Sequence, residues 1–142
     1  SSDLNALVEF VDVYPTLADL CRLPSPRGVE GISLRPVMER PQRDWKQAVF
    51  SQYPRARQGH RHQGHGEIMG YAVRTRRYRY VEWRAWASKK VIARELYDHD
   101  TDPEEMKNLA TEADQTETLK VLQGILSRGW QGALPAGRKP GP

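Results

Sequence analysis

Arginine and aromatic side chains interleave through the middle of the chain, and their chemistry suits the binding of polyanions. The arginines form two groups, Arg55, Arg57 and Arg61 and then Arg74, Arg76, Arg77 and Arg79, and the aromatic residues near the second group are Tyr78, Tyr80, Trp83 and Trp86. A guanidinium binds carboxylates, phosphates and sulfates as a planar fork, and aromatic rings stack on bases or sugars. The pattern therefore indicates a surface for nucleic acid or for an acidic polysaccharide.

The overall charge agrees with an acidic partner. The chain has 22 Lys and Arg against 18 Asp and Glu, a formal net charge of +4 and a pI of about 9.4. Such a balance favours encounters with polyanions. Most of the arginines are expected to be solvated or paired with acids, because exposed ion pairs contribute little. Arg74 is the exception, since at the end of a predicted strand its fork can hold a carboxylate or brace a contact between domains.

The loop from Gln58 to Gly66 holds three histidines, His60, His62 and His65, which raises the question of a metal site. Zinc sites usually combine histidine with cysteine or carboxylate ligands at defined spacing, held in place by further hydrogen bonds. A glycine-flanked loop that also carries an arginine supplies neither. We therefore predict no native metal site here.

Two strands of a hairpin are expected to position the second arginine group. Apolar residues alternate along residues 68–74 and 78–83 on either side of a turn, which predicts a β-hairpin. Residues 48–53 and 94–98 are also typical of strands. We expect a small antiparallel sheet of about four strands, with apolar side chains on both faces, as in a sheet covered on both sides.

A C-terminal helix near 112–128 supplies one of these covers. Thr111 and Asp114 are spaced like a capping box at its start. Its apolar stripe consists of Leu119, Leu122, Ile125 and Leu126. Packing of this stripe on the sheet gives an α+β fold.

A second helix is predicted near the N-terminus. Asp12 is placed as its N-cap, and the helix ends at Cys21. Val13, Leu17 and Leu20 share one of its faces at helical spacing. After a Pro- and Gly-containing break, residues 31–38 read as an extended connector.

The segment Glu95–Ala110 is typical of a strand that ends in a capped turn. Asp102 is placed as an N-cap before Pro103, with Glu105 three residues later, and Asn108 suits a left-handed stop. These residues predict one short turn of helix. They indicate a well-built corner rather than chemistry.

Composition limits the remaining possibilities. The 142 residues are enough for one domain, but 38% hydrophobic residues and a mean hydropathy of −0.75 are low for a self-sufficient globule. A single cysteine excludes an internal disulfide. No apolar run approaches the ~20 residues of a membrane span, and the first residues lack the features of a signal peptide.

Several segments, taken in order, resemble the sulfatases of the alkaline phosphatase/sulfatase superfamily. Glu95–Ala110 resembles the closing signature of the family. The other segments that carry the resemblance are Val8–Cys21, Ser51–Arg55, Ile68–Thr75, Tyr78–Trp83 and Gly129–Pro135. The three central segments resemble the iduronate-2-sulfatase branch, and the last resembles the tail of bacterial members. The chain thus resembles the C-terminal part of a bacterial iduronate-2-sulfatase-like enzyme.

The resemblance also implies what these residues lack. Enzymes of this family use a Cys-x-Pro-Ser-Arg motif, whose cysteine becomes formylglycine, and a calcium ion held by acidic residues. Cys21 is followed by Arg22 and Leu23 and is not in this motif, and no segment matches the calcium-binding acids. Calcium and formylglycine are therefore implied for a catalytic domain outside these residues. We expect no catalytic and no metal-binding residue here, and no activity from the chain alone.

The resemblance further implies a division of the chain and its partners. Residues 1–24 are expected to form a helix and lead-in from the catalytic domain, 25–131 the C-terminal sulfatase subdomain, and 132–142 a flexible tail. The implied partners are the catalytic domain and a sulfated glycan, in the periplasm or outside the cell, and nucleic acid is not expected. In the family, an insert at the position of the histidine loop lies near the substrate cleft. Candidates for the cleft or for an interdomain contact are Tyr53, Arg55, His65, Arg74 and Trp83.

Two functions of different classes stay open at this stage. The chain is either the C-terminal subdomain of a sulfuric ester hydrolase, which helps to shape a cleft for a sulfated glycan, or a stand-alone basic module that binds nucleic acid or a polyanionic glycan. The order of the matching segments favours the first.

Overall fold

The computed structural model describes residues 5–24, 27–55 and 67–137. It divides into two compact units, one formed by Ser1–Val49 with Trp130–Pro142 and the other by Phe50–Gly129. We call them unit 1 and unit 2 and describe each by itself. The functional division proposed from the sequence, with boundaries at residues 24 and 131, stays a prediction.

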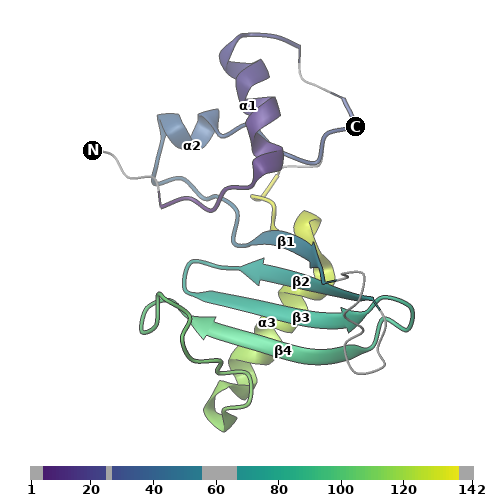
Figure 1. Ribbon diagram of the computed structural model, residues 1–142. Helices are drawn as coiled ribbons and strands as arrows, with labels where there is room; N and C mark the ends of the chain where they lie inside the picture. The colour runs from purple at the N-terminus through teal and green to yellow at the C-terminus, as the bar shows by residue number, and fades with distance from the viewer. Residues whose placement is uncertain (1–4, 25–26, 56–66, 138–142) are drawn as a thin grey trace. The chain divides into compact units, whose positions relative to one another are not determined.

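Unit 2 is built on a four-stranded antiparallel sheet, as the alternating pattern predicted. The strands are β1 (Val49–Pro54), β2 (Ile68–Arg74), β3 (Tyr78–Ala85) and β4 (Val91–Asp98), in the order β1-β2-β3-β4 (Figure 1). Strands that are neighbours in the sheet are also consecutive in the chain, so no crossover connection is needed. The strand predicted at 94–98 begins at residue 91, because its first residues pair with the extended end of β3.

The core of unit 2 lies between the sheet and helix α3 (Thr116–Arg128), which crosses one face of the sheet in Figure 1. Val73, Tyr80 and Leu96 stand opposite one another on adjacent strands and are fully buried. Leu122 of the predicted apolar stripe is the buried residue of α3. The helix starts later than the capping pattern suggested, because residues 113–115 form a separate 3-10 turn, η2 (Ala113–Gln115), with no side-chain cap.

A buried polar network accompanies this core. The Tyr80 hydroxyl donates to Glu82 Oε1 at 2.7 Å, and Arg84 donates to the other carboxylate oxygen of Glu82. Burial, reinforced by this hydrogen bond to a carboxylate, raises the pKa of Tyr80 to about 12. The phenol therefore stays protonated as a donor, and both oxygens of the buried Glu82 are satisfied.

The Asp102 carboxylate does cap the corner after β4, but the corner does not form a helix. The Asp102 carboxylate accepts hydrogen bonds from the amides of Met106 and Lys107, at 3.0 and 2.8 Å, rather than from Glu105. Glu105, not Asn108, has the left-handed backbone, with φ of 57°. A non-helical residue at this position prevents a helical turn, so the prediction of a short helix here is wrong.

Asn108 instead ties the corner to the sheet. Its side-chain oxygen accepts from the amide of Leu96 at 3.0 Å, and its side-chain nitrogen donates to the carbonyl of Arg94 at 3.1 Å. These bonds replace strand neighbours that the edge strand β4 lacks on this side.

The described residues in the N-terminal part of unit 1 form the helical segments η1 (Phe10–Asp12), α1 (Val13–Leu20) and α2 (Arg35–Glu39). The region of α2 was expected to be extended because of Pro36. The proline lies in the first turn of the helix, where a missing amide is not felt, so that expectation is wrong. The small core of this unit consists of Ile32, Val37 and Trp45.

Asp12 holds unit 1 together, though not in the manner predicted. It precedes α1 but makes no side-chain cap to that helix. Its fully buried carboxylate accepts from the amides of Glu9 and Ile32, both at 3.0 Å, and from Lys46 Nζ at 2.8 and 2.7 Å. One buried charge thus links three segments that are distant in sequence.

Two further features describe the packing of unit 1. Ala133 is buried at the end of η3 (Trp130–Ala133) and its carbonyl accepts from the amide of Gln47, while the flexible tail proposed for residues 132–142 stays a prediction. In α1 the buried residues are Pro15, Thr16 and Ala18 rather than the large apolar residues of the helix.

Candidate functional site

The face of the sheet opposite α3 carries the residues that the sequence singled out. Tyr80 points toward α3, where Gln123 interacts with its hydroxyl, so residues that alternate with Tyr80 along β3 point the other way. Strand register adds their partners. The resulting open face consists of Gly70, Ala72, Arg74, Arg79, Val81, Trp83, Glu95 and Tyr97. Among the described residues of unit 2, no helix covers this face (Figure 1).

The Trp83 ring lies flat on the open face. Gly70 stands opposite Trp83 in the register, and a Cβ added at Gly70 would approach the ring to 2.7 Å. The absence of a side chain on β2 therefore makes room for the ring. The indole Nε1 donates to Glu95 Oε1 at 2.8 Å, which fixes the ring, and the Arg55 guanidinium lies 4.8 Å from its centroid. This is a rigid aromatic platform with a cation stacked on it.

Arg79 is fully engaged at the other end of the open face. It donates from Nε and Nη2 to the two carboxylate oxygens of Glu105, and its guanidinium lies 5.0 Å from the Tyr97 ring centroid. The Arg79 fork, followed by a contact with His99 at 2.6 Å, lowers the pKa of Glu105. The same pair raises the pKa of Arg79. The charge of Arg79 is thus neutralised within the chain.

Arg74 is different from its neighbour. It ends β2 directly opposite Arg79. Its Nη1 atom is buried and has no hydrogen-bond partner among the described residues. Burial lowers the pKa of Arg74; the Glu105 carboxylate opposes this shift, the Arg79 cation adds to it, and Asp100 opposes it. A buried charged donor without an acceptor is costly.

The structure brings together most of the predicted site residues. Arg55, Arg74 and Trp83 lie on or against the open face, and strand alternation from Arg55 places Tyr53, 69% exposed, on the same side of β1. His65 lies outside the described residues, as do His60 and His62, so the loop remains a prediction. The register also gives the spacing of Arg74 and Trp83. Arg74 stands opposite Arg79, which is four residues from Trp83 along β3, a distance of roughly 13 Å.

Sequence reasoning missed the residues that hold the site in place. Glu95, Tyr97 and Glu105 were assigned only to the strand end and its corner, yet Glu95 fixes Trp83 and Glu105 neutralises Arg79. For Glu95 and Tyr97 a signal was available, because alternation along β4 places both on one face. No local sequence pattern predicts the pairing of Arg79 with Glu105, because the two residues are 26 positions apart.

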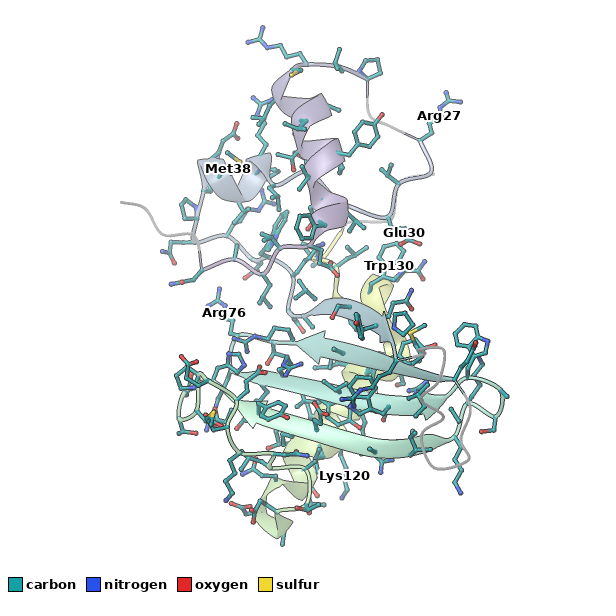
Figure 2. The ribbon with its side chains drawn as sticks, in the orientation of Figure 1. Arg27, Glu30, Met38, Arg76, Lys120 and Trp130 are labelled. Carbon is teal, nitrogen blue, oxygen red and sulfur yellow. The ribbon has the colours of Figure 1, made fainter. Side chains whose placement is uncertain are left out.

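Arg77, in the turn of the hairpin, is paired with an acid. It forms a fork with Asp98, with Nε–Oδ1 and Nη2–Oδ2 distances of 2.8 and 2.7 Å. Asp98 is buried, and the Arg77 fork lowers its pKa. The solvated arginine of this turn is Arg76, which is exposed and points away from the sheet in Figure 2.

Neither a metal centre nor a membrane segment stands out in the described part of the chain. Within residues 5–24, 27–55 and 67–137, no group of three or more His, Cys, Asp or Glu side chains could hold a metal ion. No helix there is long and apolar enough to cross a bilayer. Cys21, the one cysteine, is exposed at the end of α1.

Three known proteins show what this chain is similar to. Arylsulfatase K of Rattus norvegicus is 30% identical over 107 residues, which is 75% of this chain and 18% of the relative. A solved structure described as a complex with its substrate D-glucosamine-2-N,6-O-disulfate has a TM-score of 0.64 and 26% identity, over 82% of this chain and 22% of that one. A solved 2-O GAG sulfatase has a TM-score of 0.62 and 28% identity, over 82% and 23%.

An antiparallel sheet backed by one helix, together with these similarities, defines the class: the chain is the C-terminal subdomain of a sulfatase. It spans only about a fifth of the length of the relatives it matches. More particularly, it belongs to the family described as "N-sulphoglucosamine sulphohydrolase, C-terminal", whose profile matches residues 1–130.

Proposed function

We propose that the chain belongs to a sulfuric ester hydrolase that acts on a sulfated glycan, and that its open face forms part of the substrate cleft. The observation that carries the proposal is the buried Nη1 of Arg74, which has no hydrogen-bond partner in the described part of the chain. Sulfate and carboxylate groups supply the planar oxygen pair that a guanidinium fork binds best. A sulfated glycan that contains uronic acid carries both groups.

The rest of the open face supports this assignment. Arg79 is already neutralised by Glu105, so Arg74 is the cation left for an incoming anion at this end. At the other end, Arg55 stacks on the Trp83 ring and places a second cation on this face. The two positions lie roughly 13 Å apart along the strands, farther than one sugar ring extends. An oligosaccharide rather than a single sugar therefore suits the face.

We further propose that the parent is iduronate-2-sulfatase-like. Support comes from the central segments Ile68–Thr75 and Tyr78–Trp83, which build the open face, and from the similarity to a protein described as a 2-O GAG sulfatase. A uronate 2-sulfate carries its carboxylate and its sulfate on the same sugar, and Arg74 suits the carboxylate. A periplasmic or extracellular site of action follows for an enzyme that degrades such polymers.

The chain contributes recognition rather than bond cleavage in this proposal. Formylglycine as the nucleophile and calcium as the Lewis acid belong to the catalytic domain of the parent, since Cys21 is not in the required motif. The catalytic domain and the sulfated glycan are thus the two proposed partners.

The proposal is tested by comparing the 142-residue chain with the parent protein encoded with its upstream reading frame. We expect the chain alone to leave 4-nitrocatechol sulfate intact, with or without calcium, and the parent to release sulfate from a 2-O-sulfated uronide. Turnover by the re-purified chain, or an upstream frame without Cys-x-Pro-Ser-Arg, would contradict the proposal. Tight binding of DNA by the chain, in preference to a sulfated oligosaccharide, would favour a stand-alone polyanion-binding module instead.

A further inference from the structure

The ion pair of Arg79 and Glu105 has strong geometry, yet it lies where solvent reaches it. Arg79 Nε donates to Glu105 Oε1 at 2.6 Å, and Arg79 Nη2 donates to Oε2. The side chains of Arg79 and Glu105 are 33 and 23% exposed. Two parallel bonds of this kind are how an arginine binds a free carboxylate. Glu105 thus occupies a position on the open face that a carboxylate from outside the chain can also reach.

A second arginine stands beside this fork. Arg74 is directly opposite Arg79 in the register of β2 and β3. Like charges at opposite positions of neighbouring strands are destabilising. Glu105 neutralises Arg79, but Arg74 Nη1 has no hydrogen-bond partner among the residues that the structure describes. A carboxylate has two oxygens with about four lone-pair sites, so one carboxylate can accept from both guanidinium groups.

The corner that carries Glu105 does not depend on the Glu105 side chain. The Asp102 carboxylate accepts from the amides of Met106 and Lys107, and Asn108 bonds to the backbone of β4. Between these anchors Glu105 has a left-handed backbone, with φ of 57°. A non-glycine residue keeps such a conformation only where its surroundings impose it, and residues of this kind cluster at functional sites. The Glu105 side chain can therefore leave the fork while the corner keeps its other bonds.

His99 gives the Glu105 carboxylate a partner apart from the sheet. Its Nε2 atom lies 2.6 Å from Glu105 Oε1, the oxygen that also accepts from Arg79 Nε. If an external carboxylate replaces Glu105 on Arg79, the arginine keeps two charge-assisted bonds and Glu105 keeps its contact with His99. The exchange leaves no charge without a partner, and Arg74 gains one.

We propose that Arg74 and Arg79 together bind one carboxylate of the substrate, and that Glu105 occupies the Arg79 fork until this carboxylate displaces it. The inference rests on the proposed function, because it takes the ligand to be a glycan that contains uronic acid. Arg79 is then a second binding residue of the open face. Glu105 stabilises the unliganded chain and at the same time weakens the site for its ligand.

Isothermal titration calorimetry of the 142-residue chain tests this exchange with two probes. One is a heparin-derived tetrasaccharide, and the other is the same tetrasaccharide with its carboxyl groups reduced to alcohols. We expect Glu105→Gln to tighten binding of the first probe about 10-fold, the size of one charge-assisted hydrogen bond, and to leave binding of the reduced probe nearly unchanged. Glu104→Gln is the matched control, since it removes the same charge from an exposed neighbouring position.

Equal gains from Glu105→Gln and Glu104→Gln overturn the proposal, because net charge alone would then explain them. Weaker binding by Glu105→Gln also overturns it, since Glu105 would then hold Arg79 in place for the ligand. Arg79→Lys is a second variant that keeps the ion pair with Glu105 but lacks the fork. It should weaken binding of the unreduced probe about 10-fold, and unchanged binding by a variant that circular dichroism shows to be folded refutes Arg79 as a ligand.

Arg74→Ala separates this inference from the proposed function. Weaker binding by Arg74→Ala, without any effect of Glu105→Gln, supports the open face as the glycan site and overturns the exchange. If neither the wild type nor Glu105→Gln binds the tetrasaccharide, the exchange is refuted, and the kcat/KM of the parent enzyme decides the proposed function independently.

Discussion

At the scale of single residues, the open face depends on a glycine that makes room for a tryptophan. Gly70→Ala would place a Cβ 2.7 Å from Trp83 Cζ3, and neither the strand nor the hydrogen-bonded indole can yield without loss. We expect the substitution to lower the free energy of unfolding by about 1–3 kcal/mol, the usual range for an overpacked site. Urea denaturation followed by circular dichroism measures this change.

Gly124→Ala is the matched control, because it has the opposite expected sign. A Cβ at Gly124 meets nothing closer than 3.5 Å, and the residue lies inside α3. Replacing a helical glycine by alanine is expected to stabilise by about 0.5–1 kcal/mol. If both alanines stabilise the chain, Trp83 does not lie on Gly70 and the platform is described incorrectly.

Glu105 gives the site a dependence on pH. Its pKa is lowered from 4.5, chiefly by the fork from Arg79, so its contribution to stability is fully present above pH 4.5 and is lost as the pH falls through the lower, folded-state value. Glu105→Gln should therefore lower the melting temperature at pH 7 and reduce its fall between pH 4.5 and pH 3. Glu104→Gln, at an exposed neighbouring position, is the control. Parallel melting curves for both variants and the wild type across this range would refute the role of Glu105.

At the scale of elements, the packing of η1, α1 and the segment near Ile32 depends on the buried Asp12–Lys46 pair. Asp12→Ala would leave Lys46 inside the protein, paired with Glu9 alone among the described residues, and would free two amides. Removing one partner of a buried ion pair typically costs about 3–5 kcal/mol. We expect a loss of this size in urea denaturation. Asp44→Ala, at an exposed position of the same unit, should change stability by less than about 0.5 kcal/mol.

The elements also show which parts of the fold can be predicted from sequence. The hairpin β2–β3 and helix α3 were predicted correctly, because strict alternation and a helical stripe are local signals. Helix α2 was missed because Pro36 is a helix breaker in most positions but not in the first turn. The α1 stripe was found at the right residues. The outward direction of this stripe depends on hydrogen bonds to residues 32–35. Those residues are distant in sequence, so a periodic pattern cannot predict the direction.

The site shows the same limit. Arg74, Arg55 and Trp83 could be selected from their chemistry and their place near strand ends. The sequence could not tell that Arg77 and Arg79 are paired, because their partners Asp98 and Glu105 lie beyond the hairpin. Nor could it tell that Arg74 Nη1 has no partner among the residues that the structure describes. Sequence thus indicates which side chains can bind an anion, and only the fold tells which of them is still available.

At the scale of the whole molecule, two surfaces carry side chains with few contacts among the described residues. On the open face of the sheet, Arg74 Nη1 has no hydrogen-bond partner among these residues, and on helix α1 the side chains of Tyr14 and Leu17 are exposed. The chain spans about a fifth of the length of its relatives. In the proposed function, the open face takes part in the substrate cleft and the remainder of the parent supplies the catalytic groups.

The most direct measurement is the kcat/KM of the parent enzyme on a 2-O-sulfated uronide, with Arg74→Ala compared with Arg76→Ala. Arg76 is the control because it is exposed in the same turn and points away from the sheet (Figure 2). Loss of a charge-assisted hydrogen bond worth about 1.5–3 kcal/mol corresponds to a reduction of about 10- to 150-fold for Arg74→Ala. Arg76→Ala should leave kcat/KM unchanged. If Arg74→Ala also leaves it unchanged, the open face does not bind the substrate.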